Sequence, residues 1–149
     1  MKAREIMRRR VVTASPEMTL RELAKVLDDR GISGAPVVNS DRNLVGVVSQ
    51  TDLVRHEREE PPAKVSGYHA TLEAELRSKG MQTELPDYTK VSDVMTPWVV
   101  SFEEDTTVEE LARQMLAKRI HRVIITRGGR LAGIVTSMDV MRALLENRG

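Results

Sequence analysis

Residues 46–52 read GVVSQTD, and residues 133–139 read GIVTSMD. Each stretch is a short apolar run that contains a glycine and is followed by a hydroxyl residue and, three positions later, an aspartate. The two copies are offset by 87 residues (133 minus 46). Two copies at a fixed offset indicate an internal repeat, and a repeat decides the fold because each unit has an apolar face that its neighbour must cover.

The likeness extends upstream of both stretches. Met7 aligns with Met95, and TLRELA at 19–24 aligns with TVEELA at 107–112, both at an offset of 88 residues (95 minus 7). One residue is then absent from the second copy, near Asn43, after which the register holds to the end of both stretches. A single gap over this length indicates a true duplication.

Each copy predicts the element order β-α-β-β-α. The Thr-x-x-Glu spacing before each first helix is typical of a capping box, in which hydroxyl and carboxylate satisfy two free helix amides; the pairs are Thr19 with Glu22 and Thr107 with Glu110. Turn residues after each helix predict a hairpin. The predicted elements are strands at 11–13, 35–38 and 44–49 and a helix at 50–57 in the first copy, and strands at 99–101, 123–126 and 131–136 and a helix at 137–147 in the second.

The predicted strands are apolar at most positions, so both faces of each sheet should be covered. Neither copy is large enough to bury such a surface alone, which favours two sheets packed face to face about an approximate two-fold axis. We therefore expect an α/β (α+β) fold with repeats at 1–57 and 91–149, joined by a segment at 58–90. Within that segment, residues 70–79 predict a surface linker helix, in preference to a lid or a dimer contact.

Composition argues against several classes of function. The 149 residues include 23 Lys and Arg against 22 Asp and Glu, a net charge of +1, which disfavours nucleic acid or an anionic membrane as partner. The run Arg8–Arg10 is the one basic cluster, and we interpret it as a solvated loop. The absence of cysteine excludes disulfides and zinc–thiolate sites. With neither a signal peptide nor an apolar stretch of membrane-spanning length, the chain is expected to be soluble and cytoplasmic.

The repeated stretches resemble the CBS (cystathionine β-synthase) domain. The resemblance also rests on the methionine before each first strand, on GISGAPVV at 31–38 and on IHRVII at 120–125. It covers both ends of the chain and omits only the central insert. It implies a Bateman module, in which two repeats enclose two pseudo-symmetric clefts, and it implies a flat homodimer. The ligands of the family are AMP, ADP, ATP, S-adenosylmethionine and related adenosyl compounds.

The resemblance assigns roles to the S/T-x-x-D motif of each repeat. In the family the aspartate holds the ribose hydroxyls and the Ser or Thr contacts phosphate or ribose; the matching pairs are Ser49 with Asp52 and Thr136 with Asp139. A carboxylate accepts two hydrogen bonds from a cis-diol, a hydroxyl at a helix start lies beside amides that attract phosphate, and the preceding glycine permits close approach to the backbone. The same spacing is also a capping box that needs no ligand. Its double occurrence favours the ligand role, and both roles can coexist.

Further ligand contacts follow from family position. His121 and Arg122 precede the second strand of their repeat, where basic residues meet phosphate. An ion pair of Arg122 and packing of His121 against the cleft wall are equally good interpretations. Since the first copy has Ser33-Gly34 there, we expect two unequal sites, the better one built around Thr136, Asp139, His121 and Arg122. The resemblance also implies contacts with adenine or at strand ends from Val12, Ile32, Val47, Ile120, Ile134, Thr13 and Ser101.

No catalytic motif accompanies the repeats. The sequence contains no P-loop, HExxH or GxSxG, and the histidines, His56, His69 and His121, are not at metal-ligand spacing. We therefore predict a non-catalytic regulatory module without a metal site or covalent cofactor, with Mg²⁺ entering only alongside a bound polyphosphate. It would signal to an unidentified protein in trans. The alternative is a structural module that dimerises and docks a partner while its clefts are empty or filled by side chains.

Overall fold

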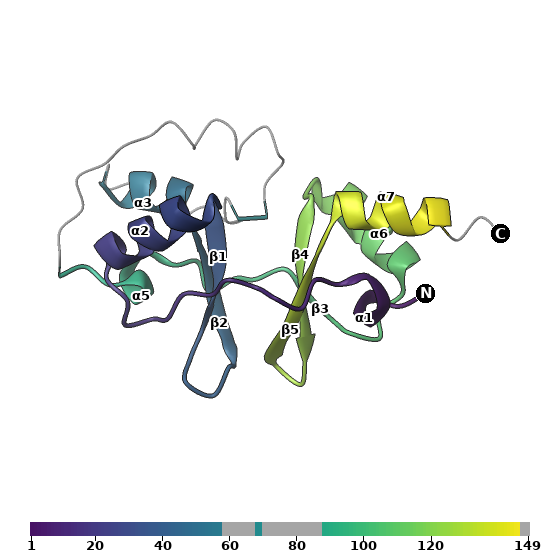
Figure 1. The fold of residues 1–149 in the computed structure, drawn as a ribbon, viewed down its shortest axis with the longest axis horizontal. Coiled ribbons are helices and arrows are strands. Elements are labelled where there is room, and N and C mark those ends of the chain that lie inside the picture. The colour runs from purple at the N-terminus through teal and green to yellow at the C-terminus, as the bar shows by residue number, and fades with distance from the viewer. Residues whose placement is uncertain (58–67, 70–87, 147–149) are drawn as a thin grey trace.

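The computed structural model of the chain describes residues 1–57, 68–69 and 88–146. Figure 1 shows two small sheets side by side at the centre of the molecule, with helices on their outer sides. One sheet has the order β1-β2 and the other β3-β4-β5, in which β3 runs parallel to β4. The elements are α1 (Ala3–Ile6), α2 (Leu20–Arg30), β1 (Gly34–Val38), β2 (Leu44–Ser49), α3 (Gln50–Glu57), α5 (Val91–Val94), β3 (Ser101–Glu103), α6 (Val108–Lys118), β4 (Arg122–Arg127), β5 (Arg130–Thr136) and α7 (Ser137–Glu146).

The two sheets pack face to face, which confirms the architecture predicted from the repeat. Val38 and Val47 of the first repeat share one buried apolar cluster with Ile124 and Leu131 of the second. All five residues of β1 are buried, as a strand covered on both faces requires. None of the described helices is long and apolar enough to cross a membrane.

The first residues of each repeat pack on the other repeat. Ala3 and Met7 belong to the apolar core formed with α6, β4, β5 and α7 of the second repeat. Val91 lies in the core formed with α2, β1 and β2 of the first repeat, and Met95 packs against it. The two halves therefore exchange their N-terminal segments reciprocally, so each core is completed by residues that belong to the other repeat in sequence.

Backbone hydrogen bonds make the same exchange. The amide of Arg8 donates to the carbonyl of Ile134 in β5 at 2.8 Å, and the Ile134 amide donates back at 3.0 Å. Thr96 and Val47 of β2 form the equivalent pair, at 2.8 and 2.9 Å. Each N-terminal segment is thus hydrogen-bonded to the sheet of the other repeat before the chain crosses to the sheet of its own repeat.

This crossing explains two differences from the predicted strands. The strand expected at 11–13 is wrong, because those residues span from Arg8 on β5 to Ala14, which alone pairs with Val37 of β1 in a parallel bridge. The strand expected at 99–101 lies two residues further along, as β3, because the chain there is still crossing from β2.

A glycine in each second strand permits the crossing. A Cβ on Gly133 would stand 2.7 Å from the carbonyl oxygen of Arg8, and a Cβ on Gly46 would stand 2.9 Å from that of Thr96. The close approach that these glycines allow is made by the crossing segment of the other repeat.

The capping boxes form unequally. Thr19 accepts from the amide of Glu22 at 3.2 Å and its own amide donates to the Glu22 carboxylate at 3.3 Å, as predicted. Thr107 accepts from the amide of Glu110 at 3.2 Å, but the carboxylate of Glu110 accepts from Gln114 at 2.9 Å. The prediction of a reciprocal second box is therefore wrong, because a neighbour one turn along the helix binds the carboxylate.

The turns of the two hairpins are hydrogen-bonded to each other. The amide of Leu44 donates to the carbonyl of Gly129 at 3.1 Å, and the amide of Leu131 donates to the carbonyl of Arg42 at 3.2 Å. At this turn end the sheets are joined through the backbone. The opposite end, where β2 runs into α3 and β5 into α7, carries the two S/T-x-x-D motifs (Figure 1).

Candidate ligand-binding site

The first motif lies at the junction of β2 and α3. Asp52 accepts through Oδ2 from the amide of Ser49 at 2.8 Å and from its hydroxyl at 3.2 Å, while the Asp52 amide donates to Ser49 Oγ at 3.4 Å. The second oxygen, Oδ1, lies 3.8 Å from Nη1 of Arg55. Both motif residues are buried. The capping role is therefore realised here, and a ligand role for Ser49 and Asp52 stays a prediction.

The second motif repeats the cap in a different electrostatic environment. Asp139 accepts through Oδ2 from the amide of Thr136 at 2.9 Å, and its own amide donates to Thr136 Oγ1 at 3.2 Å. Oδ1 faces two guanidinium groups, with Arg8 Nη2 at 3.3 Å and Arg142 Nη1 at 3.5 Å. The carboxylate is 5% exposed, whereas the arginine side chains are 58% and 59% exposed. A buried anion thus holds two cations at the surface.

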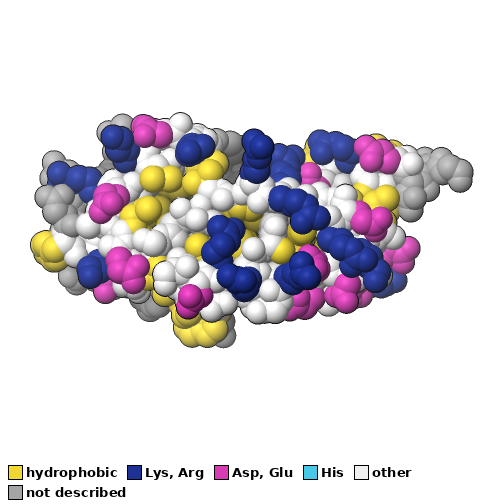
Figure 2. Space-filling view, turned by 60° about the horizontal axis from the view of Figure 1, so that its bottom comes forward, with side chains coloured by type: hydrophobic (Ala, Val, Ile, Leu, Met, Phe, Trp, Pro, Cys, Tyr) yellow, Lys and Arg dark blue, Asp and Glu magenta, His cyan; other side chains and the backbone are white. Residues whose placement is uncertain are grey.

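Among residues 1–57, 68–69 and 88–146, one arginine faces the aspartate of the first motif and two face that of the second. Figure 2 shows Lys and Arg side chains gathered over the half of the molecule that contains the second repeat. Arg8–Arg10 are exposed, as the prediction of a solvated loop expects, but Arg8 also pairs with Asp139 and with β5. Sequence reasoning missed Arg8 and Arg142 because the first lies far from the motif along the chain and the second follows it without a motif of its own.

His121 and Arg122 lie beside the second motif. Arg122 pairs in register with Thr136, and the carbonyl of His121 accepts from the amide of Ser137 at 2.7 Å. The structure thus brings the residues predicted for the better site to one end of the second sheet. The Arg122 guanidinium, however, lies over the ring of Tyr68, 4.8 Å from its centroid, and donates to the Tyr68 carbonyl at 3.4 Å. This is a cation–π contact, which neither predicted role of Arg122 included. Its ion pair and its contact with phosphate stay predictions.

His69 is buried beside Tyr68, and neither residue was singled out as a site residue from the sequence. Its Nδ1 lies 3.0 Å from the carbonyl oxygen of Arg122, and its Nε2 lies 3.3 Å from the amide of Val100. A carbonyl accepts and an amide donates, so the ring is neutral with its hydrogen on Nδ1. Burial lowers the pKa of His69 below 6.5, the bond to the Arg122 carbonyl opposes this, and the charges of Arg122 and His121 lower the pKa further.

The apolar residues predicted to contact adenine are divided among three clusters. Val47 and Ile134 share the cluster between the sheets. Ile32 packs against the core of the first repeat, and Ile120 lies in the core of the second. The structure therefore brings only the first pair together. The remaining predicted contacts are Val12 and Thr13, which are half-buried, and Ser101, which is exposed in β3.

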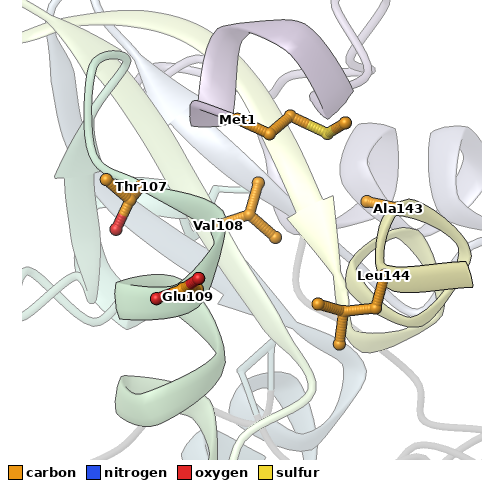
Figure 3. Close-up of a pocket in the computed structure, with 6 residues that line it drawn as sticks. All are labelled: Met1, Thr107, Val108, Glu109, Ala143 and Leu144. Carbon is orange, nitrogen blue, oxygen red and sulfur yellow. The ribbon is translucent and has the colours of Figure 1, made fainter. Parts of the chain in front are cut away.

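A separate cavity lies between α6, α7 and the start of the chain (Figure 3). Its volume is about 180 Å³, and it is lined by Met1, Thr107, Val108, Glu109, Ala143 and Leu144. None of the predicted ligand contacts lines it. Within the described part of the chain, no three His, Asp or Glu side chains lie together as a metal site would require.

Comparison with known proteins gives these observations a context. The sequence model of the CBS domain matches residues 3–59 and 91–146. The chain is 30% identical over 152 residues to uncharacterized protein MJ1426 of Methanocaldococcus jannaschii, which covers 95% of this chain and 90% of that protein. It is 31% identical over 142 residues to the inosine-5'-monophosphate dehydrogenase of the same organism, which covers 95% of this chain and 23% of the enzyme.

The fold matches solved structures over nearly its whole length. A crystal structure of CBSX2 in complex with AMP superposes with a TM-score of 0.72 at 26% identity, covering 99% of this chain and 98% of that one. CBSX2 is a CBS-pair protein of Arabidopsis thaliana.

Proposed function

This chain belongs to the CBS domain family, and from that premise we propose that it is a non-catalytic regulatory module that binds an adenosyl ligand between its repeats. One observation carries the proposal: the buried carboxylate of Asp139 lies between the half-exposed guanidinium groups of Arg8 and Arg142, one turn from the hydroxyl of Thr136. The likeness to AMP-bound CBSX2 supports it. Ligand binding would signal to a partner protein in trans by favouring one angle between the repeats.

The chemistry of the Asp139 site favours a nucleotide. Because Oδ2 is engaged by the amide of Thr136, Oδ1 is the oxygen that accepts from ribose hydroxyls. Arg8 and Arg142, whose side chains are exposed, would then turn from the carboxylate to the phosphate, while the ribose hydroxyls replace them on the buried carboxylate. Two guanidinium groups favour AMP, ADP or ATP over S-adenosylmethionine, with Mg²⁺ accompanying the longer phosphates.

A thermal-shift titration with Asp139→Asn tests the proposal. AMP at about 100 times its Kd is expected to raise the melting temperature of the wild-type protein by several degrees. Asparagine keeps an oxygen that accepts from the Thr136 amide but removes the charge that holds the ribose and the arginines. The variant is therefore expected to fold and to show no shift with AMP.

Asp93→Asn is the matched control. Asp93 accepts from the amide of Lys90 at 2.9 Å, which is the same capping contact in an exposed position on α5. This variant should keep the full AMP shift. If AMP, ADP, ATP and S-adenosylmethionine all leave the wild-type melting temperature unchanged, the proposed function is wrong.

We further propose that a second copy of the chain covers the outer face of α7, as the flat homodimer of the family implies. Val140 and Ala143 turn one face of this helix into the core. Met138, Met141 and Leu145 lie on its outer face at helical spacing, 58%, 50% and 69% exposed. Apolar side chains gathered on one helix face mark an interaction surface.

Sedimentation of a Met141→Glu, Leu145→Glu variant tests the dimer. The wild-type protein is expected to sediment with twice the chain mass and the variant as a monomer, since two carboxylates in an apolar contact would lose their hydration unpaired. Tyr88→Glu is the control, because Tyr88 is 84% exposed and lies outside α7. A wild-type monomer, or a variant that still dimerises, contradicts the proposal.

One observation favours the structural alternative for part of the molecule. The ring of Tyr68 lies in the apolar cluster between the sheets, as a module whose clefts are filled by side chains would show. The AMP titration separates the two functions, because a purely structural module has no ligand-dependent stability.

A further inference from the structure

Tyr68 and His69 belong to the insert that joins the repeats in sequence, yet they are buried between the repeats. Their side chains are 2% and 0% exposed. Figure 1 shows this short segment between β1 and β4, at the end of the sheets that carries the S/T-x-x-D motifs. The two rings contact each other edge to face, with centroids 5.3 Å apart.

Tyr68 lies between equivalent positions of the two repeats. Gly34 and Arg122 begin β1 and β4, and they are related by the repeat offset of 88 residues (122 minus 34). A Cβ on Gly34 would stand 2.9 Å from Cδ2 of Tyr68 and 3.2 Å from Cβ of Ser49. From the other repeat, the Arg122 guanidinium lies over the ring. The glycine therefore leaves room for a ring that the arginine covers.

His69 fixes this dipeptide to the second repeat. Its ring bridges the carbonyl of Arg122 and the amide of Val100, and its own carbonyl accepts from the amide of His121 at 3.3 Å. These bonds join the dipeptide to the start of β4 and to the crossing segment before β3. These hydrogen bonds hold the dipeptide in one defined position, which apolar packing alone would not do.

We propose that Tyr68 and His69 are an internal occupant of the cleft at the first motif, which an adenosyl ligand must displace. This inference rests on the proposed function. Ser49 borders the space that Tyr68 fills, and Arg122 reaches the other side of the ring from the second repeat. The Asp139 site meets phosphate through Arg8 and Arg142, so it does not need the ring to leave. A ligand at the first site needs the ring to leave. Its apparent affinity there is therefore its intrinsic affinity multiplied by the fraction of molecules in which the ring has left. The Asp139 site then fills first.

Fluorine NMR of protein labelled with 3-fluorotyrosine tests the displacement. The chain has two tyrosines, Tyr68 buried and Tyr88 84% exposed, so one resonance reports the occupant and the other is an internal reference. Tyr88→Phe assigns them. On titration with AMP beyond saturation of the Asp139 site, the Tyr68 resonance is expected to move to the exposed position while that of Tyr88 stays.

Calorimetry of Tyr68→Ala gives a second measurement. Without the ring, AMP is expected to bind the first site about tenfold more tightly or better, because no closed population competes. Tyr88→Ala, which removes an exposed ring, should leave both affinities unchanged. The fluorine titration of the wild-type protein keeps the proposal testable if Tyr68→Ala does not fold.

The outcomes separate the two proposals. If AMP binds with a Tyr68 resonance that never moves, and Tyr68→Ala has wild-type affinity and stoichiometry, the internal occupant is overturned while the proposed function stands. If neither protein binds AMP, ADP, ATP or S-adenosylmethionine, the proposed function fails, and displacement by a nucleotide fails with it.

Discussion

A chain that lacks residues 1–8 is expected to lose the fold of its second repeat, although the deleted residues belong to the first repeat in sequence. Ala3 and Met7 lie in the core of the second repeat, and Arg8 pairs with Ile134 in β5. Removing the buried side chains of Ala3 and Met7 from this core costs about 2–5 kcal/mol, which is a large fraction of a domain's stability.

Hydrogen–deuterium exchange locates the loss. The amides of β4, β5 and α6 should exchange far faster in the deleted chain, while those of β1 and β2 keep more of their protection. Arg9→Ala with Arg10→Ala is the control, because both residues are exposed and neither belongs to a buried core. If β1 and β2 lose protection before β4, β5 and α6, the N-terminal segment that packs on the second repeat does not carry the stability of that repeat.

Substitution of His69 by Ala is expected to lower the free energy of unfolding by about 2–4 kcal/mol at neutral pH, because it removes a fully buried ring and leaves two backbone groups without their partner. The wild-type protein should also lose stability on acidification. Burial lowers the pKa of His69 in the folded protein, so the unfolded chain binds the proton first. The stability of the neutral ring is complete above pH 6.5 and falls as the pH drops below that value.

The groups around His69 oppose its protonation. A second ring hydrogen, on Nε2, would face the amide hydrogen of Val100, and the charges of Arg122 and His121 lie nearby. Urea unfolding between about pH 5.5 and 7.5 measures the slope. His56→Ala, at an exposed position of α3, should keep both the stability and the slope, whereas His69→Ala should flatten it. An unchanged slope in His69→Ala would refute this assignment.

The parts of the fold set by local sequence could be predicted closely. β2 and α3 have the expected bounds, and the Thr19–Glu22 box forms as its spacing indicates. The strand expected at 11–13 fails because that segment is fixed by Arg8 on a sheet far along the chain, a contact that no local pattern encodes. The helix expected at 70–79 lies outside the described residues.

In the candidate site too, contacts between residues close in sequence could be predicted and contacts between distant residues could not. The Thr136–Asp139 contact follows from a three-residue spacing and could be predicted, whereas one of the two arginines that face Asp139 is Arg8, far away along the chain. Tyr68 and His69 come from an insert without a motif. The departure at Ser33-Gly34 was a usable signal: a glycine where the other repeat has Arg122 leaves a space, and the structure fills it with Tyr68.

The two sheets are fastened unequally at their two ends. Amide–carbonyl bonds between Leu44 and Gly129, and between Leu131 and Arg42, join one edge through the main chain. At the far edge the rings of Tyr68 and His69 lie between the repeats, and their side-chain contacts can break without breaking a strand ladder. If the two sheets separate at this far edge while the turn edge stays joined, the distance between the sheets there sets the angle between the outer helices. A small molecule bound at this edge, the farthest from the joined turns, would therefore change that angle most.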